Sequence, residues 1–233
     1  MIDTHCHLLP GLDDGTRSLS EAVALATELR NAGVTTVLCT PHLSRRFPTD
    51  LVVARERLAA LASELATAEI ALELRLAAEL SPAFAVSLDA AALEEVTIGD
   101  RYVLVELEPA TPASAVETIF EHLRGRSLKP VFAHPERSRA VAQDPRTLVA
   151  AREAGALVQV VATSVAGSWG RGVERAALAL LDAGRVDLLG SDSHRPGRAG
   201  RRLRDTLQAL ARRWGDDVVQ QLTVDGPQAL LGA

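Results

Sequence analysis

The sequence is poor in aromatic residues and cysteine. Phe, Trp and Tyr make up 3% of its 233 residues, so a hydrophobic core must be built from Ala, Leu and Val. The two cysteines, Cys6 and Cys39, provide no disulfide framework, and we expect reduced thiols in a cytoplasmic protein. No apolar run approaches the roughly 20 residues of a membrane span, and the N-terminus lacks the pattern of a secretory signal. We therefore expect no membrane insertion.

Lysine is nearly absent, since Lys129 is the only one, and the net charge is -5. This balance argues against binding of nucleic acid through bulk electrostatics. The basic residues are arginines, whose planar fork matches a phosphate group. One segment is especially rich in them and contains Arg195, Arg198, Arg201, Arg202 and Arg204.

Seven short β-rich runs alternate with helical segments. The capping pairs Ser18 with Glu21 and Ser114 with Glu117 predict two helix starts, and Asp144 before Pro145 predicts a third. The predicted strands cover residues 2–7, 34–40, 72–79, 102–107, 130–134, 157–161 and 186–191. The predicted helices cover residues 18–33, 49–68, 114–125, 144–155, 172–183, 201–214 and 216–231.

This alternation predicts an α/β fold with parallel strands and crossover helices. An open doubly wound sheet and a closed barrel both satisfy the order of elements. No linker, repeat or low-complexity segment interrupts the chain, so we expect one domain over residues 1–233.

Five of the six histidines stand at or just after the C-terminal end of a predicted strand, whereas His122 lies within a helix. Residues two apart on a strand face the same way, which applies to His5 with His7. Glu106 lies in an apolar run, where a carboxylate is costly unless it is paired or binds a metal. The remaining candidates are His42, Glu79, His134, Asp192, His194 and a carboxylate of the loop Asp13-Asp14-Gly15.

These candidate histidine and carboxylate ligands can meet at one place only if the strand ends converge, as they do at the C-terminal face of a barrel. The ligands therefore favour the barrel over the open sheet. Nine nitrogen and oxygen ligands are too many for one cation and suit two or three. The mixture of imidazole and carboxylate suits Mn, Fe, Co or Zn, and the sequence does not choose among them.

These motifs together resemble the polymerase-and-histidinol-phosphatase (PHP) superfamily. Within it, "MIDTHCHLLPGLDDG", "AHPER" and "SDSH" are similar to the bacterial tyrosine-protein phosphatases of capsule and exopolysaccharide operons, the CpsB/CapC/YwqE type. The resemblance covers nearly the whole chain. It implies a distorted seven-stranded (β/α)7 TIM-like barrel, a trinuclear centre with Mn²⁺ preferred, and phosphomonoester hydrolysis on the phosphotyrosine tail of a membrane-associated tyrosine kinase.

The resemblance also distributes roles among residues. Arg137 would bind phosphate, with a second arginine after the Asp-x-His motif. The loop there differs in length, so Arg198 is preferred over Arg195 and Arg201. The first cation would be held by His5, His7, Glu79 and Asp192, the second by Glu79, Glu106 and His134, and the third by Asp14, His42 and His194. His42 and His194 are also candidates to protonate the leaving group, if they are not committed to metal.

Three alternatives remain open. Cys39 and Arg45 fit the Cys-x5-Arg spacing of cysteine-dependent phosphatases, although Pro41 removes an amide from such a loop. Another metallohydrolase is a second alternative: an amidohydrolase, a TatD-like nuclease or a histidinol-phosphate phosphatase. Many amidohydrolases need a lysine at a strand end, but Lys129 stands at a strand start. The third is a metal-binding scaffold without turnover.

Overall fold

The computed structural model describes residues 1–232. Every paired strand runs parallel to its neighbours. The strands are β1 (Ile2–Cys6), β2 (Thr36–Cys39), β3 (His42–Leu43), β4 (Glu73–Leu76), β5 (Glu79–Leu80), β6 (Tyr102–Glu106), β7 (Lys129–Ala133), β8 (Leu157–Val161) and β9 (Leu188–Gly190). The helices are α1 (Leu19–Asn31), α2 (Leu51–Thr67), α3 (Pro82–Ser87), α4 (Ala90–Glu95), α5 (Ala113–Arg124), α6 (Arg139–Gln143), α7 (Val149–Glu153), α8 (Ala162–Val165), α9 (Arg171–Asp182), α10 (Ala199–Trp214), α11 (Asp216–Gln220) and α12 (Gly226–Leu231).

The strands form two sheets whose edges meet. One sheet has the order β1-β2-β4 and the other β3-β5-β6-β7-β8-β9. Beyond β9, the N–H of Asp192 donates to the carbonyl of His5 at 2.9 Å, and that of His7 donates to Ser193 at 3.0 Å. At the other junction, the N–H of Glu79 donates to the carbonyl of Pro41 at 3.0 Å. Backbone hydrogen bonds thus connect the sheets on both sides.

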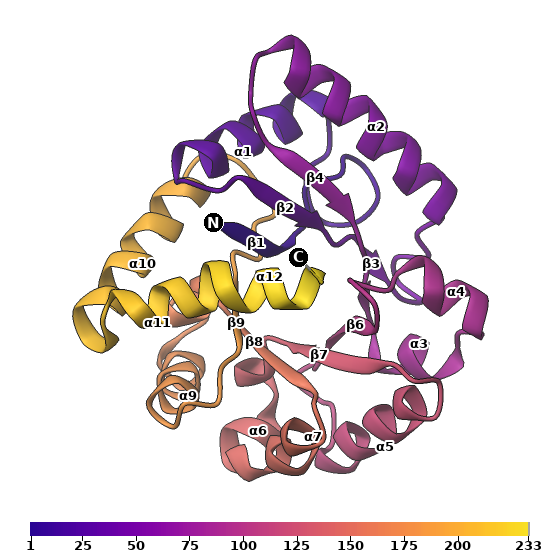
Figure 1. Cartoon of the computed structure of the whole chain (residues 1–233), viewed down its shortest axis with the longest axis vertical. Helices are drawn as coiled ribbons and strands as arrows, with labels where there is room; N and C mark the ends of the chain where they lie inside the picture. The colour runs from indigo at the N-terminus through magenta and orange to yellow at the C-terminus, as the bar shows by residue number, and fades with distance from the viewer. Residues whose placement is uncertain (233) are drawn as a thin grey trace.

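Helices surround the strands, and α12 crosses them near the chain termini (Figure 1). Leu230 of α12 packs into an apolar cluster on the inner face of the strands, which includes Leu104 of β6 and Ala77 between β4 and β5. Because side chains alternate along a strand, Glu106 follows Leu104 and Glu79 follows Ala77 on that same face. The inner face therefore changes from apolar to ligand-bearing toward the C-terminal ends of the strands.

The sequence located the main elements and misjudged several boundaries. The run 72–79 is two strands, β4 and β5, and β3 lies beyond the run 34–40. Ser18 caps α1 as predicted, accepting from the Glu21 N–H at 3.2 Å. The predicted cap at Ser114 is wrong: α5 begins one residue earlier, because Pro112 itself takes the extended N-cap conformation. Residues 216–231 are interrupted by a π-helical turn at Gln221–Asp225.

Within residues 1–232, no helix combines the length and apolar character needed to cross a membrane.

Candidate metal centre

His5 lies on β1 and His7 directly after it, and their imidazole rings turn their Nε2 atoms toward each other. His5 Nδ1 lies 2.7 Å from the Gln159 side-chain carbonyl, and His7 Nδ1 lies 2.7 Å from the Asp13 carboxylate. Both partners are acceptors, because the Gln159 amide nitrogen donates to Thr4 at 2.8 Å. Each Nδ1 therefore carries a hydrogen, which leaves each Nε2 to bind a metal cation or, without one, a proton. The two Nε2 atoms are 3.2 Å apart, so a proton or a metal cation is needed between them.

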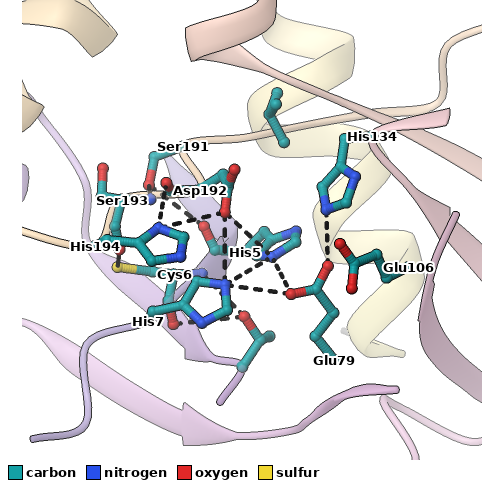
Figure 2. Close-up of polar contacts among 12 residues, drawn as sticks. His5, Cys6, His7, Glu79, Glu106, His134, Ser191, Asp192, Ser193 and His194 are labelled. Atoms are coloured by element: carbon teal, nitrogen blue, oxygen red, sulfur yellow. Dashed lines mark hydrogen bonds and ion pairs between the residues drawn. The ribbon is translucent and has the colours of Figure 1, made fainter. Parts of the chain in front are cut away.

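Two carboxylates complete this arrangement (Figure 2). Glu79 Oε2 lies 3.2 and 3.3 Å from the Nε2 atoms of His5 and His7, and Asp192 Oδ1 lies 3.6 and 3.5 Å from them. Four ligands about 2.1 Å from a shared cation in a tetrahedron are about 3.4 Å apart. Glu79 Oε2 is also buried without a hydrogen-bond donor. The donor set therefore fits a divalent transition metal.

Further groups of donor atoms adjoin this one. His134 Nε2 contacts Glu79 Oε1 at 2.8 Å, and His42 Nδ1 contacts Glu79 Oε2 at 3.1 Å. Glu79 thus stands between two sides of the cluster, and Figure 2 places Glu106 beside it, on the side of His134. The groups whose donor atoms approach closely enough for a shared ion are His5–His7–Asp192, His5–Glu79–His134, His42–Glu79–Glu106 and His7–Asp14–His42–His194. All nine predicted ligands belong to this continuous cluster.

Electrostatics keep this cluster ready to accept cations. Burial alone would raise the pKa of Glu79, but the charge of His5 and the hydrogen bond from His134 hold it well below the usual range. Burial, together with the nearby charge of Glu79, raises the pKa of Glu106 to about 7. Burial is also the main reason that the pKa values of His42 and His194 are lowered, which leaves both rings neutral at pH 7. Neutral imidazole is the form that binds metal.

The backbone departs from common geometry where two ligands leave their strands. His134 has φ of 33° and Asp192 has φ of 51°, a left-handed region that side chains other than glycine seldom adopt. Because of this backbone conformation, the side chains of His134 and Asp192 point in directions that a continuing strand would not allow. Such strain is concentrated at functional sites.

Arg137 and Trp169 border the cluster together. The Arg137 Nη2 donates to Asp192 Oδ2 at 2.6 Å, and its guanidinium carbon lies 4.1 Å from the centre of the Trp169 ring. Thr163 Oγ1 accepts from both side chains, at 3.3 Å from Arg137 and 3.2 Å from Trp169. Arg137, Trp169 and seven of the predicted ligands line one cavity of about 350 Å³. Arg137 is thus held beside the candidate metal ligands.

The arginines after His194 have different surroundings. Arg198 and Arg195 line a neighbouring cavity, whereas Arg201 pairs with Asp205 at 3.5 Å and lines none of the described cavities. Arg195 is already engaged, since it donates to the backbone carbonyl of Asp14 at 3.3 Å. Arg198 therefore remains the best placed of the three candidates.

The sequence did not indicate three residues that contact the site: Asp13 and Gln159 beside candidate ligands, and Trp169 beside Arg137. The sequence marks Asp13 only as part of a loop. Its carboxylate accepts a hydrogen bond from His7 Nδ1 and another from the His42 N–H at 2.9 Å. Gln159 is fully buried on β8 and fixes His5. Trp169 is 56% exposed beside Arg137. The buried polar position of Gln159 within an apolar strand was the one available signal.

The cysteine-dependent alternative is wrong. Cys39 is fully buried in β2, and burial raises the pKa of its thiol far from neutrality, whereas Arg45 is exposed. A thiolate nucleophile needs the opposite environment. Lys129 lies at the start of β7, away from the strand ends that carry the ligands.

The fold and the cluster define an α/β protein that gathers imidazoles and carboxylates at the C-terminal ends of parallel strands. A family model described as capsular polysaccharide synthesis, CpsB/CapC, matches residues 1–232, and the chain belongs to this family. The family predicted from the motifs is therefore confirmed.

Relatives of known function cover nearly the whole chain. The tyrosine-protein phosphatase YwqE of Bacillus subtilis (strain 168) is 28% identical over 225 residues, covering 96% of this chain and 89% of YwqE. The tyrosine-protein phosphatase CpsB of Streptococcus pneumoniae is 27% identical over 248 residues, covering 99% and 98% of the two chains. A crystal structure from work on YwqE and CpsB, described as unique metal-dependent tyrosine phosphatases, superimposes with a TM-score of 0.87 at 26% identity, covering 100% of this chain and 94% of that one.

A more distant structure shares the fold alone. Histidinol phosphate phosphatase from Lactococcus lactis has a TM-score of 0.50 at 11% identity, covering 89% of this chain and 92% of that one.

Proposed function

We propose that this protein is a metal-dependent protein-tyrosine phosphatase. The observation that carries the proposal is the convergence of two imidazole lone pairs and two carboxylate oxygens on one buried point, 3.2 to 3.6 Å apart. Such a site suits divalent cations, and Arg137, whose planar fork matches a phosphoryl group, lines the same cavity. The named relatives are tyrosine-protein phosphatases, which supports phosphotyrosine as the substrate.

The ligand assignment follows the groups of donor atoms. His5, His7 and Asp192 would hold one cation, with Glu79 bridging to a second. Glu106 and His134 would complete the second, and Asp14, His42 and His194 would hold a third. Bound divalent cations would supply Lewis-acid polarisation and an activated water at neutral pH. Mn²⁺ is our preferred metal, with Fe, Co or Zn as alternatives.

The residues of the chain would bind and orient the phosphate. Arg137 would offer its fork to the phosphoryl oxygens, and Arg198 would approach from the neighbouring cavity. Phenolate, with an ordinary pKa of about 10, leaves more readily than an alkoxide and needs less help from an acid. Because burial lowers the pKa of His42 and His194, we assign both to metal rather than to proton donation.

We also propose the architecture of the chain and its biological partner. We infer that the two connected sheets form one distorted seven-stranded (β/α)7 barrel, in which β4 and β5 together make one strand and β3 extends β2, and that residues 1–233 are a single domain. The family name links the protein to capsular polysaccharide synthesis. Its partner would be a bacterial tyrosine kinase bearing phosphotyrosines, in the cytoplasm.

One assay tests this function. Metal-depleted protein, with and without added Mn²⁺, is offered a phosphotyrosine peptide, histidinol phosphate and a DNA oligomer. We expect activity on the peptide only after metal is restored, and we expect Cys39→Ala to retain most of it. Activity that survives exhaustive chelation would contradict the metal mechanism. Preference for histidinol phosphate would instead assign the protein to the neighbouring branch of the superfamily.

A further inference from the structure

A second, larger cavity adjoins the metal cluster. Its volume is about 760 Å³, within the range of ligand-binding pockets. Asp14, Asp192 and His194 lie at the end that it shares with the cluster, and Trp169 lines both cavities. A substrate held at the metals can therefore extend past Trp169 into this space.

The far side of the cavity is basic. Arg198 and Arg202 line it, and neither makes an ion pair among the described residues. Arg198 is the N-cap residue of α10 and Arg202 lies in its first turn, and the side chains of both reach this cavity. Neighbouring arginines of α10 are engaged elsewhere: Arg201 pairs with Asp205, and Arg204 donates to the carbonyl of Asn31 at 3.3 Å.

The backbone at the start of α10 does not provide the binding groups. The Glu28 side chain accepts from the N–H groups of Gly197 and Gly200, so the helix end is already capped. The positive character of this side comes from the two guanidinium groups. Two unpaired arginines facing one cavity, in a chain of net charge -5, point to an anionic ligand.

We infer that this cavity binds an acidic side chain next to the phosphotyrosine of the substrate peptide, with Arg202 as a specificity-determining residue. The inference rests on the proposed function and deepens it. The substrate class is then a phosphotyrosine peptide with Asp or Glu near the phosphorylated residue. Arg198 lines this cavity and is also the candidate for the phosphate, whereas Arg202 contacts only the flanking residue.

The test compares two phosphotyrosine peptides that differ only in flanking residues, two Glu in one and two Gln in the other. With Mn²⁺-loaded wild type, KM should be about fivefold lower for the acidic peptide, the upper end for a solvent-exposed ion pair. Arg202→Gln should remove this preference by raising KM for the acidic peptide alone, with kcat unchanged. Arg202→Lys should retain part of the preference, and added salt should reduce it.

Arg212→Gln is the matched control, because it makes the same change of charge near the opposite end of α10. It should keep the wild-type preference. Equal KM values for the two peptides in wild type would overturn the inference alone, as would equal effects of Arg202→Gln on both peptides. Failure of the Mn²⁺-loaded wild type to hydrolyse either peptide would overturn the proposed function, and this inference with it.

Discussion

His7 donates its Nδ1 hydrogen to the carboxylate of Asp13 across 2.7 Å. Burial opposes ionisation of Asp13, but the hydrogen bond and charge of His7 and two backbone N–H groups lower its pKa to about 2. A carboxylate that stays ionised keeps the hydrogen on Nδ1, so His7 Nε2 is the atom that binds a cation once its proton has left. Asp13 therefore acts on the metal through His7 without binding it.

The substitution Asp13→Asn removes this charge and keeps the size of the side chain. We expect metal affinity to fall about 10- to 100-fold, the usual cost of losing a partner of a ligating histidine. Isothermal titration with Mn²⁺ measures the change. Asp205→Asn, at an exposed ion pair, is the control and should bind as wild type does. Equal affinities for Asp13→Asn and wild type would show that Asp13 does not orient His7.

Metal binding should release protons. Burial disfavours the charged form of His7, but hydrogen bonds with Asp13, Asp192 and Glu79 raise its pKa well above the ordinary value. The ring consequently holds an extra proton at neutral pH until a cation displaces it. Metal affinity should rise with pH between 6 and 8, by about tenfold per pH unit for each proton released. Calorimetry in two buffers of different ionisation enthalpy gives the number of protons, and identical heats in both would contradict this expectation.

Gly190 permits the close approach of β9 to β1. A Cβ at this position would lie 2.7 Å from the Cβ of His5 and 3.2 Å from the Gln159 side chain. Gly190→Ala should therefore displace His5, weaken metal binding and cost about 1 to 3 kcal/mol of unfolding free energy. Gly172→Ala has open space around the new methyl group and should be neutral or slightly stabilising. Urea unfolding measures the unfolding free energy of both variants. Equal values for Gly190→Ala and Gly172→Ala would refute the steric argument.

Trp169 is a positioning residue for Arg137. Replacing it with Leu removes the stacking and the hydrogen bond to Thr163, so kcat/KM for phosphotyrosine should fall by about fivefold. Trp169→Phe retains the stacking and should recover most of the activity. A merely structural role would instead lower the thermal stability of both variants without this difference in kinetics. Activity of Trp169→Leu within twofold of wild type would rule out the positioning role.

The sequence indicated which residues cluster better than it indicated the boundaries of the strands and helices. The spacing of His5 and His7 places both on one face of a strand, which identifies them as a pair of candidate ligands. Glu106 is identified because a carboxylate in an apolar run is costly unless it is paired or binds a metal. Chemistry of this kind is local and can be recognised without coordinates. The family resemblance then distinguished Asp14 from Asp13, which composition alone does not do.

The remaining features depend on contacts between distant segments. The division of run 72–79 into β4 and β5 reflects two successive pairing partners, β2 and then β3 with β6. Gln159 carries no motif, and its role exists only because β8 brings it to His5. The short helices α3 and α4 were missed because each spans only six residues, too few for a clear apolar period.

The most direct test of the metal centre is a crystal structure of Mn²⁺-loaded protein, with anomalous scattering recorded on both sides of the manganese absorption edge. We predict two or three manganese peaks inside the cluster, one of them in contact with His5, His7 and Asp192, and another sharing Glu79. A difference map without manganese peaks among these residues, at full occupancy of the protein, would contradict the assignment.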